Sequence, residues 1–142
     1  MTQERKKLVE LKNVSLTFNK GKSNEVEAID DVSFDIYEGE IFGLVGESGS
    51  GKTTIGRSVL KLSDIDSGTV TFSGNEISSL KGKDLHDFRK IDQMIFQDPQ
   101  SSLNGRMKIR DIIAEGIDIH KLAKSKEERE AKVKELIDLV GL

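Results

Sequence analysis

Residues 46–53 read G-E-S-G-S-G-K-T, which matches the pattern G-x-x-x-x-G-K-[ST] of loops that bind phosphate groups. Gly46, Gly49 and Gly51 have no Cβ and tolerate positive φ, so the backbone can curl closely around a polyphosphate and point its amides inward. We expect the Lys52 ammonium to bridge the β- and γ-phosphates, and the Thr53 hydroxyl to coordinate Mg²⁺. This segment, the phosphate loop, therefore predicts a nucleoside triphosphate site.

The sequence on either side of the phosphate loop has the context that this motif requires. Residues 41–45 are apolar on both faces, as in a central parallel strand that is covered on both sides. Residues 52–62 predict a helix with Ile55, Val59 and Leu62 on one face, and its positive N-terminal end would face the phosphates. The alternative is a glycine-rich turn without a ligand. A strand before the motif and a helix after it favour the binding site.

The rest of the chain predicts an α/β fold. Alternating apolar and polar residues indicate strands at 14–18 and 32–36, with further strands at 70–72 and 91–96. Three more helices are expected, one over 80–89, one whose apolar face runs from Ile109 to Ile117, and a last one that Ser125 begins and Gly141 ends. Glu128, three residues after Ser125, would complete a capping box.

Composition excludes several classes of protein and site. The net charge is -3, from 22 basic and 25 acidic side chains, so nothing favours nucleic acid as a partner. Cysteine is absent, which excludes disulfides and thiolate metal sites. No apolar run approaches the roughly 20 residues that a transmembrane helix needs, and no signal peptide is expected. If the protein works at a membrane, we expect a partner to supply the membrane-spanning part.

Two strings of sequence resemble one family in particular. Residues 44–54 read L-V-G-E-S-G-S-G-K-T-T, and residues 95–104 read I-F-Q-D-P-Q-S-S-L-N. Both resemble ABC-transporter ATPases of the oligopeptide and dipeptide importer subfamily. The resemblance implies a P-loop core with an N-terminal antiparallel β subdomain and the start of a helical subdomain. It divides one incomplete ATP-binding domain, residues 1–142, into a core up to about residue 97 and a Q-loop and helical part from about residue 98.

The resemblance also assigns roles to residues. Gln97 matches the Q-loop glutamine, which implies contact with Mg²⁺ or the attacking water, although a glutamine at a strand end can be an ordinary polar terminus. Phe18 matches the aromatic that stacks on adenine, although it also continues the apolar face of Val14 and Leu16 and can be a core residue. The implied ATP-binding set is Phe18, Gly46, Glu47, Ser48, Gly49, Ser50, Gly51, Lys52, Thr53 and Thr54.

The resemblance further implies transmembrane permease subunits and a second ABC ATPase subunit as partners, at the cytoplasmic face of the membrane. Peptides are the expected cargo, and nickel and glutathione are the alternative cargoes, because their importers use similar subunits. The sequence departs from the subfamily at Gly105, where proline is usual. It also contains no signature, Walker B strand, catalytic glutamate or switch histidine. We therefore expect a chain that at most binds Mg-ATP, from a parent that hydrolyses it. A soluble ABC ATPase and a non-catalytic fragment are the alternatives.

Overall fold

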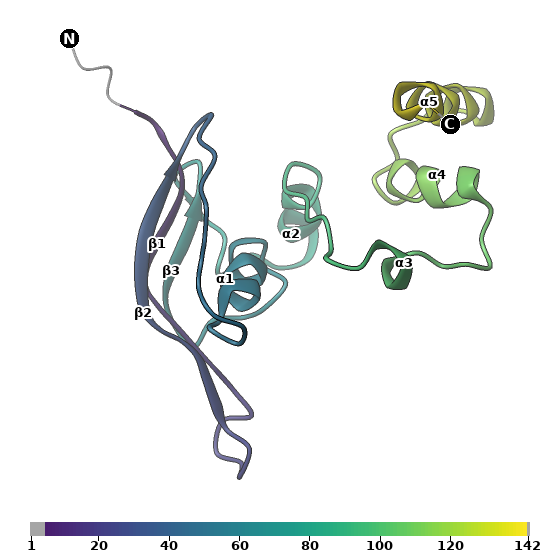
Figure 1. Ribbon diagram of the computed structural model, residues 1–142. Helices are drawn as coiled ribbons and strands as arrows, with labels where there is room; N and C mark the ends of the chain where they lie inside the picture. The colour runs from purple at the N-terminus through teal and green to yellow at the C-terminus, as the bar shows by residue number, and fades with distance from the viewer. Residues whose placement is uncertain (1–4, 142) are drawn as a thin grey trace. The chain divides into compact units, whose positions relative to one another are not determined.

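The computed structural model describes residues 5–141, apart from the side chains of residues 99 and 100. These residues form two compact units, one that ends at Gln93 and one that begins at Met94 (Figure 1). Each unit has its own buried core, and each is described by itself. The subdomain division expected near residue 97 stays a prediction.

The first unit is built on a four-stranded antiparallel sheet in the order β2-β1-β3-β4. Alternation directs one set of side chains from the sheet into the core, including Leu11 and Val14, which are almost completely buried. Two residues separate this pair, so strict alternation would place them on opposite faces. A bulge at Asn13, with φ 49°, shifts the register and returns Val14 to the core face. The strands are β1 (Lys7–Phe18), β2 (Val26–Tyr37), β3 (Ser67–Phe72) and β4 (Asn75–Glu76).

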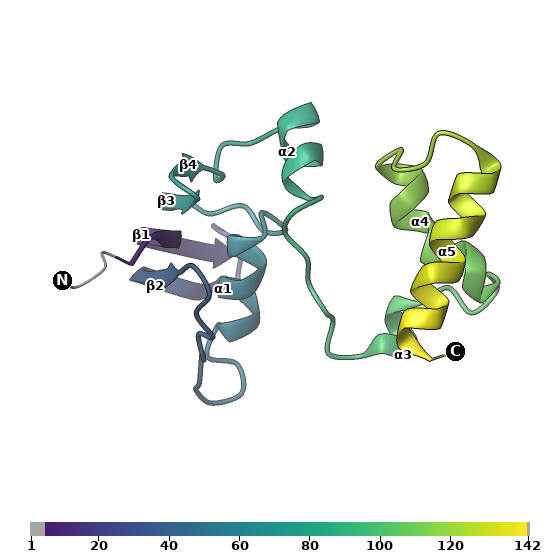
Figure 2. The same cartoon turned by 90° about the horizontal axis from the view of Figure 1, so that it is seen from above.

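Two helices accompany the sheet in the first unit. Helix α1 (Lys52–Val59) packs on the core through Ile55, and it lies against one face of the sheet in both views (Figures 1 and 2). Helix α2 (Gly82–Phe88) contributes the buried ring of Phe88, which meets Phe72 edge-on with ring centres 5.4 Å apart. The core thus joins both helices to the inner face of the sheet.

The second unit contains α3 (Pro99–Ser102), α4 (Ile109–Ile119) and α5 (Lys126–Val140). Helices α4 and α5 pack through a small core of Ala114, Ile117 and Val133. The predicted ends of α5 are confirmed. The Ser125 hydroxyl accepts a hydrogen bond from the Glu128 amide at 3.2 Å, and Gly141 has φ 76°. The Glu128 carboxylate accepts from the Lys124 amide rather than from Ser125, so the capping box is displaced by one residue.

Two predicted strands do not form. Residues 41–45 and 91–96 are irregular, and Ile41, Val45 and Ile95 are 99%, 91% and 95% exposed. Both were expected as strands of a sheet, and a strand persists only where a neighbour satisfies its amides and carbonyls. No strand pairs with either segment between residues 5 and 141. Phe42 finds another partner and stacks on Phe34 with ring centres 4.9 Å apart.

Helix α1 is also shorter than predicted. It ends at Val59, because Lys61 adopts a left-handed conformation with φ 51°, and Leu62 lies beyond the helix. Across the described residues, no helix has the length and apolar character needed to cross a bilayer.

Candidate nucleotide-binding site

The phosphate loop passes directly into α1. A turn closes where the Ser50 amide donates to the Glu47 carbonyl at 3.2 Å. Gly49 and Gly51 have φ of 83° and 84°, values that side chains other than glycine rarely adopt. Gly51 occupies the N-cap of α1, and no side chain in the described part of the chain caps its first amides. An anion at this helix end would meet both these amides and the positive end of the helix dipole.

Strand β2 fixes the position of the loop. A Cβ placed on Gly51 would lie 2.2 Å from the carbonyl oxygen of Ala28 in β2, so the two backbones approach more closely than any side chain permits. A Cβ on Gly46 would lie 2.7 Å from the Ser50 hydroxyl, so the first residue of the loop also lies close to Ser50. The sheet therefore holds the loop at its helical end.

The Lys52 ammonium lies over the loop. Its Nζ donates to the carbonyl of Gly46 at 2.9 Å, to the carbonyl of Glu47 at 2.5 Å and to the Ser50 hydroxyl at 3.2 Å. These oxygens position a full positive charge where the motif places the phosphates. Glu47, Ser48 and Ser50 are themselves exposed to solvent.

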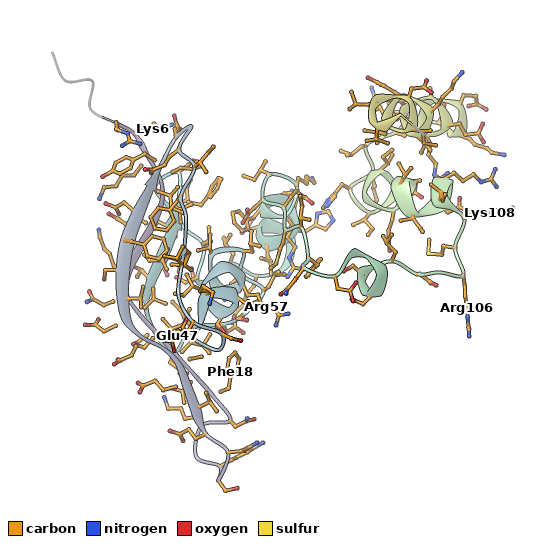
Figure 3. The ribbon with its side chains drawn as sticks, viewed as in Figure 1. Lys6, Phe18, Glu47, Arg57, Arg106 and Lys108 are labelled. Atoms are coloured by element: carbon orange, nitrogen blue, oxygen red, sulfur yellow. The ribbon has the colours of Figure 1, made fainter. Side chains whose placement is uncertain are left out.

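A pocket of about 250 Å³ connects the loop to the end of the β1–β2 hairpin. Phe18, the last residue of β1, is 42% exposed and projects toward the loop side of the sheet (Figure 3). Phe18 is therefore not a buried core residue as Val14 and Leu16 are. The pocket is lined by Phe18, Val26, Ala28, Gly49, Gly51, Lys52, Thr53 and Thr54. The structure thus brings the predicted base-stacking residue into one pocket with five of the predicted phosphate-binding residues. The other four, Gly46, Glu47, Ser48 and Ser50, are not among the lining residues.

Val26 and Ala28 are lining residues that sequence reasoning missed. Nothing in their side chains indicates a ligand, and their place in the pocket depends on the strand register that pairs Phe18 with Val26. Gln97 lies in the second unit, exposed, in the irregular segment before α3. Its predicted role as a Q-loop glutamine stays a prediction.

The residues for a magnesium site are few. Among the described residues, no group of three or more histidine or carboxylate side chains could hold a metal ion. Thr53 is exposed in the first turn of α1 and lines the pocket. A hydroxyl alone is a weak ligand, so Mg²⁺ would bind here mainly through the phosphate oxygens of a bound nucleotide. The site fits Mg²⁺ that arrives with its nucleotide.

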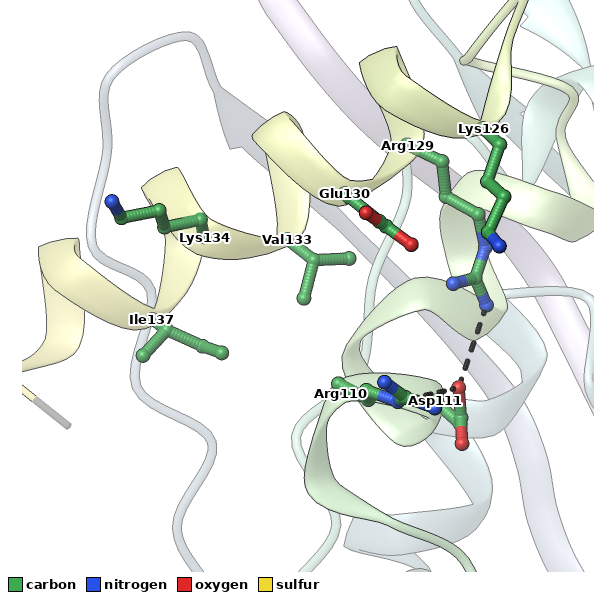
Figure 4. Close-up of a pocket in the computed structure, with 8 residues that line it drawn as sticks. All are labelled: Arg110, Asp111, Lys126, Arg129, Glu130, Val133, Lys134 and Ile137. Carbon is green, nitrogen blue, oxygen red and sulfur yellow. Dashed lines mark ion pairs between the residues drawn. The ribbon is translucent and has the colours of Figure 1, made fainter.

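A second pocket, of about 320 Å³, lies between α4 and α5 (Figure 4). Both of its arginines have carboxylate partners. Arg129 makes a two-pronged ion pair with Asp118 at 2.7 and 2.8 Å and lies 3.8 Å from Asp111, and Arg110 lies 3.7 Å from Asp111. It is lined by Arg110, Asp111, Lys126, Arg129, Glu130, Val133, Lys134 and Ile137. No glycine is among these residues, and the acidic side chains Asp111 and Glu130 line the pocket, so its larger volume does not make it the phosphate site.

The chain is similar to proteins of one kind. The family model described as ABC transporter matches residues 29–142. The oligopeptide transport ATP-binding protein OppF of Streptococcus mutans is 72% identical over 142 residues, which is all of this chain and 46% of that protein. The dipeptide transport ATP-binding protein DppF of Lactococcus lactis is 61% identical over 141 residues, 98% of this chain and 45% of that protein. The chain thus spans less than half the length of these relatives.

A solved structure supports the same relationship. The dimeric ATP-binding cassette MJ0796, in a post-hydrolysis state bound to ADP and Pi, has a TM-score of 0.77 and 27% sequence identity. The match covers 95% of this chain and 58% of that chain. The predicted fold class is therefore confirmed, even though two expected strands are missing.

Proposed function

Because the chain belongs to the ABC transporter family, we propose that it forms the nucleotide-binding, N-terminal part of the ATP-binding subunit of a peptide importer. In this proposal it binds Mg-ATP, with the triphosphate in the phosphate loop and the base near Phe18. The relatives named for oligopeptide and dipeptide transport support the choice of cargo.

One observation carries the proposal. A single pocket is lined both by the exposed ring of Phe18 and by Gly49, Gly51 and Lys52 of the phosphate loop. A nucleoside triphosphate has the same distribution of chemistry, with a flat apolar base at one end and a polyanion at the other. Lys52 lies at the phosphate end, and Thr53, in the first turn of α1, offers its hydroxyl to the magnesium ion that accompanies the phosphates.

We expect binding without repeated turnover. Hydrolysis needs a group that orients and deprotonates the attacking water, and no carboxylate is among the eight lining residues. In the complete subunit, permease subunits and a second ATP-binding subunit are the proposed partners. The dimeric state of the similar cassette supports the second of these. The proposed location is the cytoplasmic face of the membrane, as a peripheral subunit.

A titration with ATP tests the proposal. We expect Lys52→Ala to weaken binding by at least about 100-fold, because a charged hydrogen bond contributes about 1.5–3 kcal/mol and Lys52 would make more than one. Thr53→Ala should remove mainly the difference between titrations with Mg²⁺ and with a chelator. Lys134→Ala, which removes an equal charge from the α4–α5 pocket, is the matched control and should bind as the wild type does. Equal affinity of Lys52→Ala and Lys134→Ala for ATP would contradict the proposal.

A further inference from the structure

We propose that Asp66 is a positioning residue for the nucleotide site, although it does not line the pocket. Its carboxylate fixes the end of strand β1, and Phe18 is the last residue of that strand. The proposal rests on the proposed function, since it needs a nucleotide whose base lies on Phe18. Asp66 thereby acts on the base only through another side chain, by keeping an exposed ring in one position.

The end of β1 is supported unequally by its two neighbouring strands. On the β2 side the ladder continues to the last residue, where Phe18 pairs with Val26. On the β3 side the ladder ends at the pair of Ser15 and Ser67, because β3 begins at Ser67. The β1–β2 hairpin therefore runs past β3 (Figure 1), and residues 16–18 have no strand partner on that side within the described part of the chain.

Asp66 takes the place of the missing strand residue. Its main-chain amide donates to the Ser15 carbonyl at 2.8 Å, and its carboxylate accepts a hydrogen bond from the Thr17 amide at 2.7 Å. A residue of a paired strand would supply one donor and one acceptor in the same way. The acceptor of the Thr17 bond is a carboxylate, and hydrogen bonds to charged groups are stronger than those between neutral groups. One residue in the turn before β3 thus extends the support of β1 from Ser15 to Thr17.

Phe18 depends on this support because its own side chain is not anchored. The residue is 42% exposed, so packing in the core does not hold its ring. Thr17 is the residue directly before it, and without an acceptor for the Thr17 amide the backbone of residues 16–18 would make its strand hydrogen bonds with β2 alone. Strand ends fray readily, and an isolated two-stranded hairpin is marginally stable in water. A frayed ring must be ordered each time a base binds, and this loss of entropy weakens binding.

The ion pair of Asp66 is a separate and weaker interaction. The Lys20 ammonium lies 3.9 Å from the other carboxylate oxygen, and the Lys20 side chain is 71% exposed. Exposed pairs of this kind contribute little, because water screens both charges. The support of Phe18 therefore comes from the Thr17 amide bond. Lys20→Ala is the matched control, because it removes the cation beside Asp66 and keeps that bond.

Calorimetric titrations of the purified chain with ATP and with inorganic tripolyphosphate, each with Mg²⁺, test the proposal. Asp66→Ala should weaken the binding of ATP about fivefold, the lower end of the cost of ordering one residue of backbone. It should leave the binding of tripolyphosphate unchanged, because that ligand has no base. Asp66→Asn keeps a side-chain oxygen that can accept from the Thr17 amide, so it should recover most of the lost affinity. Lys20→Ala should bind both ligands as the wild type does.

A double substitution shows whether Asp66 acts through Phe18. Phe18→Ala alone should weaken ATP binding, through loss of the stacked ring. If Asp66 only positions that ring, adding Asp66→Ala to Phe18→Ala should cause no further loss. Losses that multiply in the double variant would overturn the proposal. Equal weakening of ATP and tripolyphosphate by Asp66→Ala would also overturn it, because a general loss of structure would then explain the effect.

The same titrations separate this proposal from the proposed function. Unchanged ATP affinity in Asp66→Ala, or an Asp66→Asn chain that binds ATP no better than Asp66→Ala, would overturn the role of Asp66 and leave the nucleotide site intact. A wild-type chain that binds ATP no more tightly than tripolyphosphate would contradict the contact of the base with Phe18, and the role of Asp66 with it. Failure of the wild type to bind either ligand would contradict the phosphate site itself.

Discussion

Replacing Gly51 by alanine should destabilise the first unit, because it forces the phosphate loop away from strand β2. The new Cβ would lie 2.2 Å from the carbonyl oxygen of Ala28, so loop and strand must separate by about 0.8 Å to reach even a tight 3.0 Å contact. A left-handed backbone costs a residue other than glycine about 1–2 kcal/mol. Relieving an overlap of this kind typically costs about 1–3 kcal/mol more. We expect Gly51→Ala to lower the free energy of unfolding of the first unit by about 2–5 kcal/mol.

Gly49→Ala is the matched control for this substitution. Gly49 has nearly the same φ, 83°, but no atom lies within 4 Å of the position its Cβ would take. It should therefore cost only the conformational part, about 1–2 kcal/mol. Urea unfolding without nucleotide measures both variants, with the fluorescence of Tyr37 as the probe, because it is the only tyrosine and the chain has no tryptophan. Tyr37 ends β2, so its signal reports on the first unit. Equal losses in the two variants would refute the close approach of loop and strand.

Three further substitutions test other parts of the structure. Burial raises the pKa of Asp92 to about 6, so the folded state holds its proton more tightly than the unfolded state. Stability should therefore fall as the pH rises from about 4 to 6, and Asp92→Asn should remove this loss, about 1 kcal/mol for a half-exposed group, in urea unfolding at each pH. Ser125→Ala should destabilise α5 by about 1 kcal/mol through loss of the bond from the Glu128 amide, measured by helical circular dichroism. The ion pair with Arg129 holds the pKa of Asp118 below its usual value. The pair therefore stabilises the α4–α5 unit at a pH above the usual pKa of an aspartate, and this stabilisation is lost as acid protonates Asp118. Asp118→Asn should abolish this acid dependence of the circular dichroism, and an unchanged profile would exclude the pair.

The sequence predicted best the elements that depend on residues close to them in the sequence. Ser125 and Gly141 bound α5 because capping depends on the few residues around a helix end. The alternation at 14–18 and 32–36 predicted two strands. Both begin earlier than expected, β1 at Lys7 and β2 at Val26. The extension follows from pairing between the strands, because each ladder bond supports the next residue even where the apolar pattern is weak.

The errors come from segments whose structure depends on distant partners. Residues 41–45 have the composition of a buried parallel strand, but composition cannot supply the neighbour that such a strand needs. The phosphate loop was predictable from its motif, since its chemistry requires those residue types at that spacing. Val26 and Ala28 were not, because a valine and an alanine in a strand carry no chemical signal, and only the register places them beside the loop.

The central claim is that main-chain amides of the phosphate loop hold the polyphosphate together with Lys52. Nitrogen–proton correlation spectra of the labelled chain, recorded during a titration with Mg-ATP, observe those amides directly. The account predicts the largest shift changes at Gly49, Gly51 and Lys52, with smaller changes at Phe18. Changes confined to α4 and α5, or an unchanged phosphate loop at saturating nucleotide, would contradict it.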